Sequence, residues 1–366
     1  MGILDKLERK LYKKRVPMAV TIEVTKRCNL DCIHCYVDHE DLDVELSIKD
    51  FKGVIDQLYD LGVIIIVLSG GELFYKKGIW ELMEYIRFKK MGLKIITAAT
   101  LLNKSDADRL KDLGILEVGI SIYSHKAEVH DFITRKEGSF KKTLEMATYL
   151  REIGVLVVSK TLIMNLNYKD IIDVYNMSVE RGIIPQFDMS ISDAQNDARD
   201  PKQFSLTSEQ IVELYQNKEV REILYNTKSF EDTYCKPKYE YQDEDERCNI
   251  GRTAMWINAK GEVFPCIQFQ YPVGDLKIDS LKDIWYNNPK IDKVLEMAKY
   301  KNYKACHNCE AVKYCSPCIA LTVRENRTDC NTTNHKEAFA IKKVFEELDA
   351  KKENLDLSSL SDYLTK

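Results

Sequence analysis

The sequence predicts an α/β fold: a partial (β/α)6 TIM-like barrel followed by a small cysteine-rich C-terminal domain. Two observations predict it. Strand-like and helix-like segments alternate six times between residues 19 and 191, and this pattern is typical of a parallel sheet with crossover helices outside it. Eight of the eleven cysteines then lie between Cys235 and Cys330, after the alternation has ended.

The strands are expected where short apolar or β-branched runs occur. The run at 63–68 is apolar throughout, as expected for a strand covered on both faces. The six predicted strands are 19–24, 63–68, 93–97, 116–123, 155–162 and 183–189. Between them we expect helices at 47–61, 77–90, 104–113, 139–153 and 168–181, several of which end at a glycine. Right-handed crossovers would curl such a sheet into a barrel, with catalytic groups in the loops that follow the strands.

The remaining segments divide the chain further. A polar stretch at 192–205 predicts a linker, 207–225 and 335–350 predict helices, and Lys260-Gly261 predicts a hairpin turn. The basic N-terminal segment, residues 1–16, predicts a solvated helix packed at the domain edge; the alternative is a helix that contacts a membrane surface. The expected units are a lead-in helix, the barrel, a linker with a bridging helix, the cysteine-rich domain, and a C-terminal helix and tail. Their boundaries are 1–18, 19–191, 192–234, 235–334 and 335–366.

Composition excludes several classes of function. The 366 residues contain 54 Lys plus Arg and 58 Asp plus Glu, a formal net charge of −4, so a nucleic-acid partner, which needs a basic face, is not expected. No apolar stretch is long enough to span a bilayer, and the start has no secretory signal. We therefore expect a cytoplasmic protein whose cysteines are metal ligands rather than disulfides.

The first cysteine group has the spacing C-x3-C-x2-C, from Cys28 through Cys32 to Cys35. A single helical stripe is the alternative, but the outer two cysteines would then be separated by ~10 Å of axial rise. The segment directly follows a predicted strand, which favours a wrapped loop. Three soft thiolates suit zinc or iron–sulfur, and structural zinc normally takes four protein ligands. A [4Fe–4S] cluster with one open iron therefore fits better, and we place His34 outside the ligand set.

This run, with the aromatic Tyr36 after it, closely resembles the motif of the radical S-adenosylmethionine (SAM) superfamily. The resemblance implies that the open iron binds SAM, and that one electron from the cluster cleaves SAM to methionine and a 5′-deoxyadenosyl radical. That radical would take a hydrogen atom from the substrate. The protein would supply placement, redox tuning and exclusion of water.

Short motifs outside the cysteine segment also match the family and extend the resemblance over 19–189. Gly70-Gly71-Glu72 follows the second strand and matches the family loop that binds the amino group of SAM. Ser121 matches a serine that contacts the methionine carboxylate or ribose. Arg135 would pair with that carboxylate, the alternative being a solvated surface arginine. At the third strand's end, 97–100 departs from the family's Thr-Asn-Gly, which puts an adenine contact there in doubt.

The second cysteine group resembles the SPASM extension of sulfatase maturases and peptide-modifying radical enzymes. The resemblance implies one or two auxiliary [4Fe–4S] clusters, with structural zinc as the alternative. One cluster would take Cys306, Cys309, Cys315 and Cys330. The other would take Cys248, Cys266 and Cys318, with Cys235 as a fourth ligand, or with an open iron or a non-cysteine ligand in its place. The chain differs from the family pattern at one place: two residues separate Cys315 from Cys318, where the family has three.

The leading hypothesis for function is modification of a ribosomally made peptide by cross-linking, thioether formation, epimerisation or oxidation. The enzymatic alternative is maturation of a protein or cofactor: a sulfatase-type formylglycine, a quinone or a modified tetrapyrrole. The third hypothesis is a non-catalytic iron–sulfur protein. The Gly-Gly-Glu loop argues against it, because such a protein does not need to bind SAM. The expected partners are a peptide or small-molecule substrate, an electron donor such as flavodoxin or ferredoxin, and a separate leader-peptide-binding protein. The sequence identifies no catalytic acid or base.

Overall fold

A nine-stranded sheet forms the centre of the protein. The computed structural model describes residues 3–37, 45–195, 199–225, 242–246, 248–315, 318–320, 336–344 and 346–347. The strand order is β6-β5-β4-β3-β2-β1-β7-β8-β9. The strands are β1 (Ala19–Glu23), β2 (Ile65–Ser69), β3 (Gly92–Thr97), β4 (Glu117–Ser121), β5 (Val157–Leu162), β6 (Ile184–Asp188), β7 (Trp256–Ile257), β8 (Glu262–Phe264) and β9 (Gly274–Asp275).

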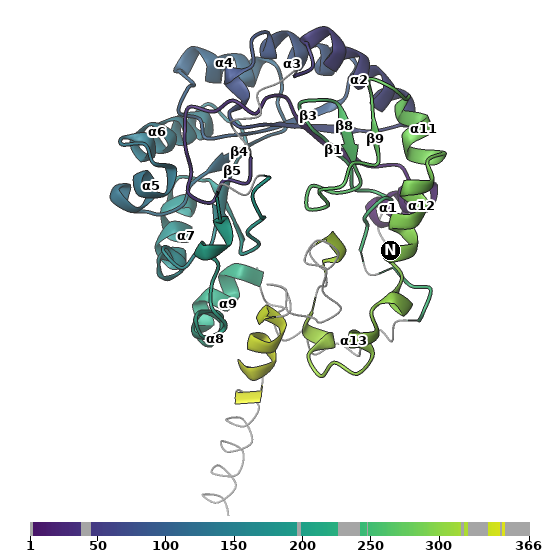
Figure 1. The fold of residues 1–366 in the computed structure, drawn as a ribbon. Coiled ribbons are helices and arrows are strands. Elements are labelled where there is room, and N and C mark those ends of the chain that lie inside the picture. The colour runs from purple at the N-terminus through teal and green to yellow at the C-terminus, as the bar shows by residue number, and fades with distance from the viewer. Residues whose placement is uncertain are drawn as a thin grey trace, which may run out of the picture.

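The first six strands are parallel and curve into a partial barrel with helices on the outside (Figure 1), which confirms the predicted fold class. These helices are α2 (Ile48–Leu61), α3 (Ile79–Phe88), α4 (Lys104–Asp112), α5 (Ala127–Thr134), α6 (Ser139–Glu152) and α7 (Ile171–Glu180). Alternate strand residues, such as Ile22 on β1 and Leu68 on β2, are fully buried in the main core. Their neighbours along each strand therefore face the inside of the barrel.

Local sequence signals explain the helix ends that were predicted correctly. Ser47 caps α2 in a capping box with Asp50, and Gly62 ends the helix at φ 91°. A left-handed φ at this position strains any residue with a Cβ, so glycine is favoured there. Asn103 and Asp106 form the same reciprocal cap on α4. Both helices therefore begin where their side chains satisfy free backbone N–H groups.

Three helical segments differ from the prediction. Helix α5 (Ala127–Thr134) was not expected, because its 8 residues are too few to show a clear helical period. The helix expected at 207–225 is two helices, α8 (Ser208–Gln216) and α9 (Lys218–Tyr225), since the Asn217 side chain accepts the Glu219 N–H and starts a new helix. The helix expected at 77–90 is shorter: a 3₁₀ turn, η1 (Leu73–Tyr75), precedes it, and α3 begins after Gly78.

The C-terminal part of the chain extends the core sheet. Strand β7 pairs in parallel with β1, and β7 and β8 form the predicted hairpin, in which Gly261 has φ 91°. Helices α11 (Leu281–Tyr286), α12 (Pro289–Met297) and α13 (Lys304–His307) follow. The N-terminal helix α1 (Ile3–Lys14) reaches this part too: just after it, Arg15 donates to the Trp285 carbonyl at 2.6 Å. Among the described residues, no helix combines the length and apolar character needed to cross a bilayer.

Candidate functional site

The segment with the first three cysteines is a loop at the C-terminal end of β1. Its backbone is anchored on the last turn of α5, because the Asp31 N–H donates to Thr134 O at 3.2 Å and the Ile33 N–H to Ile133 O at 2.9 Å. No helix forms between residues 24 and 37. The wrapped loop expected from the spacing is therefore confirmed; we call residues 24–37 the cluster loop.

Cys28, Cys32 and Cys35 line one cavity of about 200 Å³ at the C-terminal ends of the barrel strands. This is the place where catalytic groups sit in such barrels. The other lining residues come from the cluster loop, from the ends of β2, β3 and β4, and from α5: Leu30, His34, Tyr36, Val37, Ser69, Gly70, Gly71, Ile96, Thr97, Ala98, Ser121, Tyr123, His130 and Thr134.

The three thiols are held in surroundings that oppose ionisation in the absence of a cation. Burial raises the pKa of Cys28 to about 11. Burial also raises the pKa of Cys32, and the nearby Cys35 and Cys28 raise it further, while burial raises that of Cys35. A positively charged centre bound by all three would reverse this, because a thiolate is the metal-binding form. Three clustered soft donors fit an iron–sulfur cluster.

Gly70 and Gly71 bring the second-strand turn directly against the cluster loop. A Cβ on Gly70 would lie 2.6 Å from Thr25 O, and one on Gly71 would lie 2.5 Å from Arg27 O. The Gly71 N–H donates to Thr25 O and the Glu72 N–H to Arg27 O, both at 2.8 Å. The glycines are therefore required for close contact between two backbones, one of which carries the cysteines.

Glu72 is fully buried and bonded to the end of β3. Its carboxylate accepts hydrogen bonds from Thr97 Oγ1 at 2.7 Å and from the Ala98 N–H at 2.9 Å. Burial raises its pKa although these bonds oppose the shift. Glu72 is not among the residues that line the cavity. Its contact with the SAM ammonium stays a prediction; in this structure it ties the glycine turn to β3.

The other predicted SAM-binding residues divide into two sets. Tyr36 and Ser121 line the cavity beside the cysteines. Arg135 lies outside it, at the end of α5, where its half-exposed guanidinium donates to Asp31 on the cluster loop at 3.0 Å. Arg199 binds the other Asp31 oxygen at 2.5 Å. A contact between Arg135 and the methionine carboxylate stays a prediction, and its contact here fastens the cluster loop to α5.

Sequence reasoning missed a group of aromatic and imidazole side chains on the cavity wall. A hydrogen bond of 3.1 Å joins His34 Nε2 to the Tyr123 hydroxyl, and the Tyr123 N–H donates to His130 Nδ1 at 3.2 Å. Burial lowers the pKa of both histidines to about 4, so both rings are neutral near pH 7. The only signal in the sequence was the position of His34 between two cysteines.

The end of β3 also lines the cavity, despite its departure from the family pattern. Ile96, Thr97 and Ala98 lie on the wall, and Ala99 follows with φ 59°. Ile96 and Ala98 are apolar, and the Thr97 hydroxyl and the Ala98 N–H donate to Glu72. Residues 96–98 therefore still form part of the cavity wall.

The later cysteines separate into two groups in the described part of the chain. Cys248, Cys266 and Cys318 pack against the main core, whereas Cys309 and Cys315 pack against a second core cluster around α8. Burial raises the pKa of Cys248 to about 11, and Cys266 and Cys318 contribute. The two ligand sets implied by the SPASM resemblance stay a prediction. Cys306 is buried in α13, and Cys235 and Cys330 lie outside the described residues.

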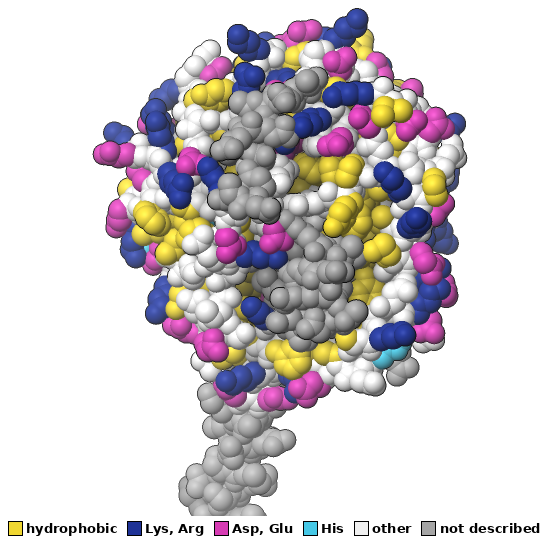
Figure 2. All heavy atoms as spheres, in the orientation of Figure 1, with side chains coloured by type: hydrophobic (Ala, Val, Ile, Leu, Met, Phe, Trp, Pro, Cys, Tyr) yellow, Lys and Arg dark blue, Asp and Glu magenta, His cyan; other side chains and the backbone are white. Residues whose placement is uncertain are grey.

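The segment after β6 connects both cysteine regions. The Gln195 N–H donates to the carbonyl of Tyr36 on the cluster loop at 2.8 Å. Ser192 Oγ donates to Gln268 Oε1, also at 2.8 Å, two residues beyond Cys266. In Figure 2 hydrophobic side chains gather around the centre of this face.

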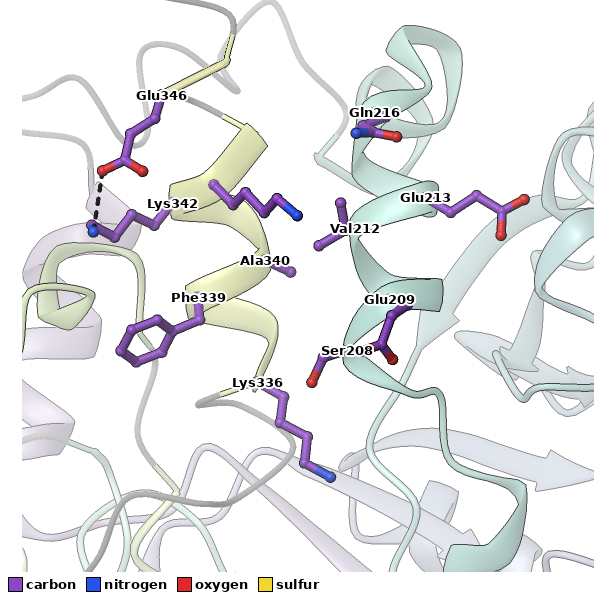
Figure 3. A pocket seen from close by; sticks show the side chains of 11 residues that line it. Ser208, Glu209, Val212, Glu213, Gln216, Lys336, Phe339, Ala340, Lys342 and Glu346 are labelled. Carbon is purple, nitrogen blue, oxygen red and sulfur yellow. Dashed lines mark ion pairs between the residues drawn. The ribbon is translucent and has the colours of Figure 1, made fainter.

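A second cavity, of about 450 Å³, lies between α8 and the helical residues 336–344 (Figure 3). Val212 and Ala340 point toward one another across it; the glutamates Glu209 and Glu213 lie on the α8 side, and the lysines Lys336, Lys342 and Lys343 lie on the other. One pair, Lys342 and Glu346, is joined at 3.1 Å. Its lining contains no cysteine, so this groove is separate from the thiol-lined cavity.

We expect Gly71→Ala to weaken SAM binding by at least about tenfold, because the added methyl group must push two backbones apart and small displacements at a reacting centre are costly. The affinity is measured by anaerobic calorimetry with reconstituted protein. Gly53→Ala in α2 is the matched control, since nothing lies within 4 Å of its added Cβ. Equal affinity in the two variants would show that the close approach at Gly71 is unimportant.

Comparison with protein families gives two matches. Residues 22–177 match the model of the radical SAM superfamily, and residues 248–310 match the SPASM model, an iron–sulfur cluster-binding domain. The first range contains the cluster loop, the glycine turn and Ser121. The second contains Cys248, Cys266, Cys306 and Cys309.

Individual relatives match most of the chain. The antilisterial bacteriocin subtilosin biosynthesis protein AlbA of Bacillus subtilis is 28% identical over 85% of this chain and 69% of its own length. An AdoMet-dependent heme synthase of Methanosarcina barkeri is 23% identical over 83% of this chain and 91% of its own. Streptococcus suis SuiB bound to precursor peptide SuiA has the same fold, with a TM-score of 0.69, 18% identity, and 91% of this chain and 79% of that chain covered.

These matches agree with the donor chemistry of the cavity. Cys28, Cys32 and Cys35 would hold a [4Fe–4S] cluster, which would supply the single electron that cleaves SAM. The chain's own residues line the cavity in which SAM would bind beside that cluster. The protein belongs to the radical SAM superfamily and carries a C-terminal SPASM iron–sulfur domain.

Proposed function

We propose that this radical SAM enzyme modifies residues of a ribosomally made peptide, by cross-linking, thioether formation, epimerisation or oxidation. The observation that carries the proposal is the likeness to AlbA, a bacteriocin biosynthesis protein, over 85% of the chain. That match extends over both the barrel and the cysteine-rich part. The fold shared with SuiB, solved with a precursor peptide, adds support.

The proposal assigns roles to the predicted site residues. Cys28, Cys32 and Cys35 hold the SAM-binding cluster, and Tyr36, Gly70, Gly71, Glu72, Ser121 and Arg135 shape the SAM site. The remaining cysteines hold one or two auxiliary clusters that carry electrons or bind substrate. The units follow the predicted boundaries, with the barrel at 19–191 and the cysteine-rich domain at 235–334.

Two partners complete this scheme. The cluster needs a one-electron donor, and flavodoxin or ferredoxin fits that need. A separate leader-binding protein would deliver the peptide. A reducing compartment, the cytoplasm, suits clusters that depend on free thiols.

The second candidate function is maturation of a protein or cofactor, such as a formylglycine, a quinone or a modified tetrapyrrole. The likeness to AdoMet-dependent heme synthases favours this candidate, because it extends over 83% of the chain. The two candidates use the same cluster and SAM site and differ only in the substrate.

Mass spectrometry separates the candidates. The chain is co-expressed anaerobically with a short precursor peptide encoded beside its gene, and the peptide is isolated. We expect a mass change that corresponds to loss of hydrogen or to a linkage, and a change of retention without a mass change for epimerisation. An unmodified peptide, combined with turnover of a tetrapyrrole by the same preparation, would favour the second candidate.

A further inference from the structure

A partly buried carboxylate outside the cavity contacts both the cluster loop and the segment after the glycine turn. Glu45 lies just before α2, with a side chain 13% exposed. One carboxylate oxygen accepts hydrogen bonds from the Thr25 hydroxyl at 2.6 Å and from the Lys26 N–H at 2.9 Å. Both donors belong to the cluster loop, only a few residues before Cys28.

The second oxygen of Glu45 binds the segment that follows the glycine turn. Lys76 Nζ lies 3.0 Å from it and also donates to Leu46 O at 2.8 Å. Lys76 ends η1, the 3₁₀ turn that directly follows Gly70-Gly71-Glu72. Although burial opposes ionisation, the bonds from Thr25, Lys26 and Lys76 hold the pKa of Glu45 below its usual value. The ion pair is therefore intact near pH 7.

Thr25 transmits this contact to the glycine turn. Its hydroxyl, held by Glu45, accepts the Arg27 N–H at 3.2 Å, and its carbonyl accepts the Gly71 N–H at 2.8 Å. The Glu45–Lys76 pair is also mostly shielded from water, with side chains 13% and 11% exposed. Such a pair fixes geometry more firmly than a surface pair.

The same short segment reaches the cysteine-rich half of the chain. The Leu46 N–H donates to Ala259 O at 2.8 Å in the β7–β8 hairpin. A Cβ on Gly261 would lie 3.1 Å from Leu46 Cδ1, so the hairpin turn rests on this leucine. The hairpin leads to Cys266 within a few residues. Residues 45 and 46 thus contact the cluster loop, η1 and the hairpin.

We propose that Glu45 is a positioning residue for SAM, which fixes the spacing between the cluster loop and the glycine turn through Thr25 and Lys76. Glu45 does not line the cavity and acts only through these neighbours. The proposal concerns cofactor binding and is independent of the substrate's identity. Replacing a residue that hydrogen-bonds the ligands of a metal site, without touching the metal, commonly lowers metal affinity or activity about 10- to 100-fold.

The test compares four variants of the full chain, purified and reconstituted anaerobically. Glu45→Gln removes the charge but keeps the size, Thr25→Val removes the hydroxyl, and Thr25→Ser restores it. Glu81→Gln is the control, because it breaks an exposed ion pair, with Lys52, that lies outside this network. Iron content, the dissociation constant for SAM, and the EPR spectrum of the reduced cluster with and without SAM are measured.

We expect Glu45→Gln and Thr25→Val to weaken SAM binding by about tenfold or more and to reduce the change that SAM causes in the EPR spectrum. Their iron content and their SAM-free spectrum should match the parent. Thr25→Ser and Glu81→Gln should bind SAM as the parent does. Parental SAM affinity in both Glu45→Gln and Thr25→Val overturns the proposal. A loss of iron in step with SAM affinity overturns it as well, because the network would then build the cluster site itself.

Discussion

A variant with alanine at positions 28, 32 and 35 is expected to form no detectable 5′-deoxyadenosine from SAM under reducing, anaerobic conditions. The three thiols are the cysteine donors that line the cavity, and without them no cluster is held beside the glycine turn. The product is measured by liquid chromatography after reduction with dithionite. Fold integrity is checked by circular dichroism.

A matched control replaces a cysteine of the second group. Cys309 lies against the second core cluster, away from this cavity. The Cys309→Ser variant should therefore still cleave SAM, although it should contain less iron than the parent. Undiminished cleavage by the triple variant would show that SAM is activated elsewhere. Complete loss of cleavage in Cys309→Ser would show that the two cysteine regions do not act separately.

Glu23→Gln is expected to stabilise the protein at pH 8. Glu23 is the last residue of β1, is 1% exposed, and neither carboxylate oxygen has a hydrogen-bond partner of normal geometry. Burial raises its pKa from 4.5 to about 7; Lys26 and the Ala259 N–H oppose this shift, and Glu45 adds to it. A neutral amide of the same size avoids the cost of a buried charge.

The sign of the pH dependence follows from the raised pKa. Between pH 4.5 and about 7 the folded chain keeps a proton at Glu23 that the unfolded chain has lost, so stability falls as pH rises through this window and is constant above it. At pH 8 the raised pKa of Glu23 lowers the free energy of unfolding by roughly 3 kcal/mol, since each tenfold difference in proton affinity is worth ~1.4 kcal/mol.

Urea unfolding of the parent and of Glu23→Gln at pH 5 and pH 8 measures this effect. The advantage of the variant should grow from under about 1 kcal/mol at pH 5 to roughly 3 kcal/mol at pH 8. Glu84→Gln, at an exposed carboxylate paired with Arg109, should show a much smaller change. An advantage that is equal at both pH values would mean that Glu23 has an ordinary pKa in the folded protein.

The predictable part of the fold came from local patterns. Apolar runs of strand length predicted β1 to β6, and Ser47 with Asp50 predicted the start of α2, because each signal lies within a few residues of the structure it specifies. Helix α5 and the break at Asn217 were missed. The helical residues of α5 are stabilised by the cluster loop and by α6 rather than by their own periodicity.

The candidate site was predicted unevenly for a similar reason. The cluster loop and the glycine turn were recognised because their residue types and spacing are themselves the chemical signal. The His34–Tyr123–His130 group was missed, since three segments far apart in the sequence meet there only after the sheet has curved. The direction of Glu72, toward Thr97 and Ala98, likewise depends on the register of β2 against β3.

The sequence by itself determined the donor atoms, their spacing and the alternation of strands and helices, because covalent order and local periodicity carry that information. The tertiary structure alone decided which groups meet at the strand ends. It placed Glu45 between the cluster loop and the glycine turn, and it left the carboxyl of Glu23 buried without a partner of normal geometry. These contacts join loops from different strands, so they exist only once sheet register and curvature have brought the loops together.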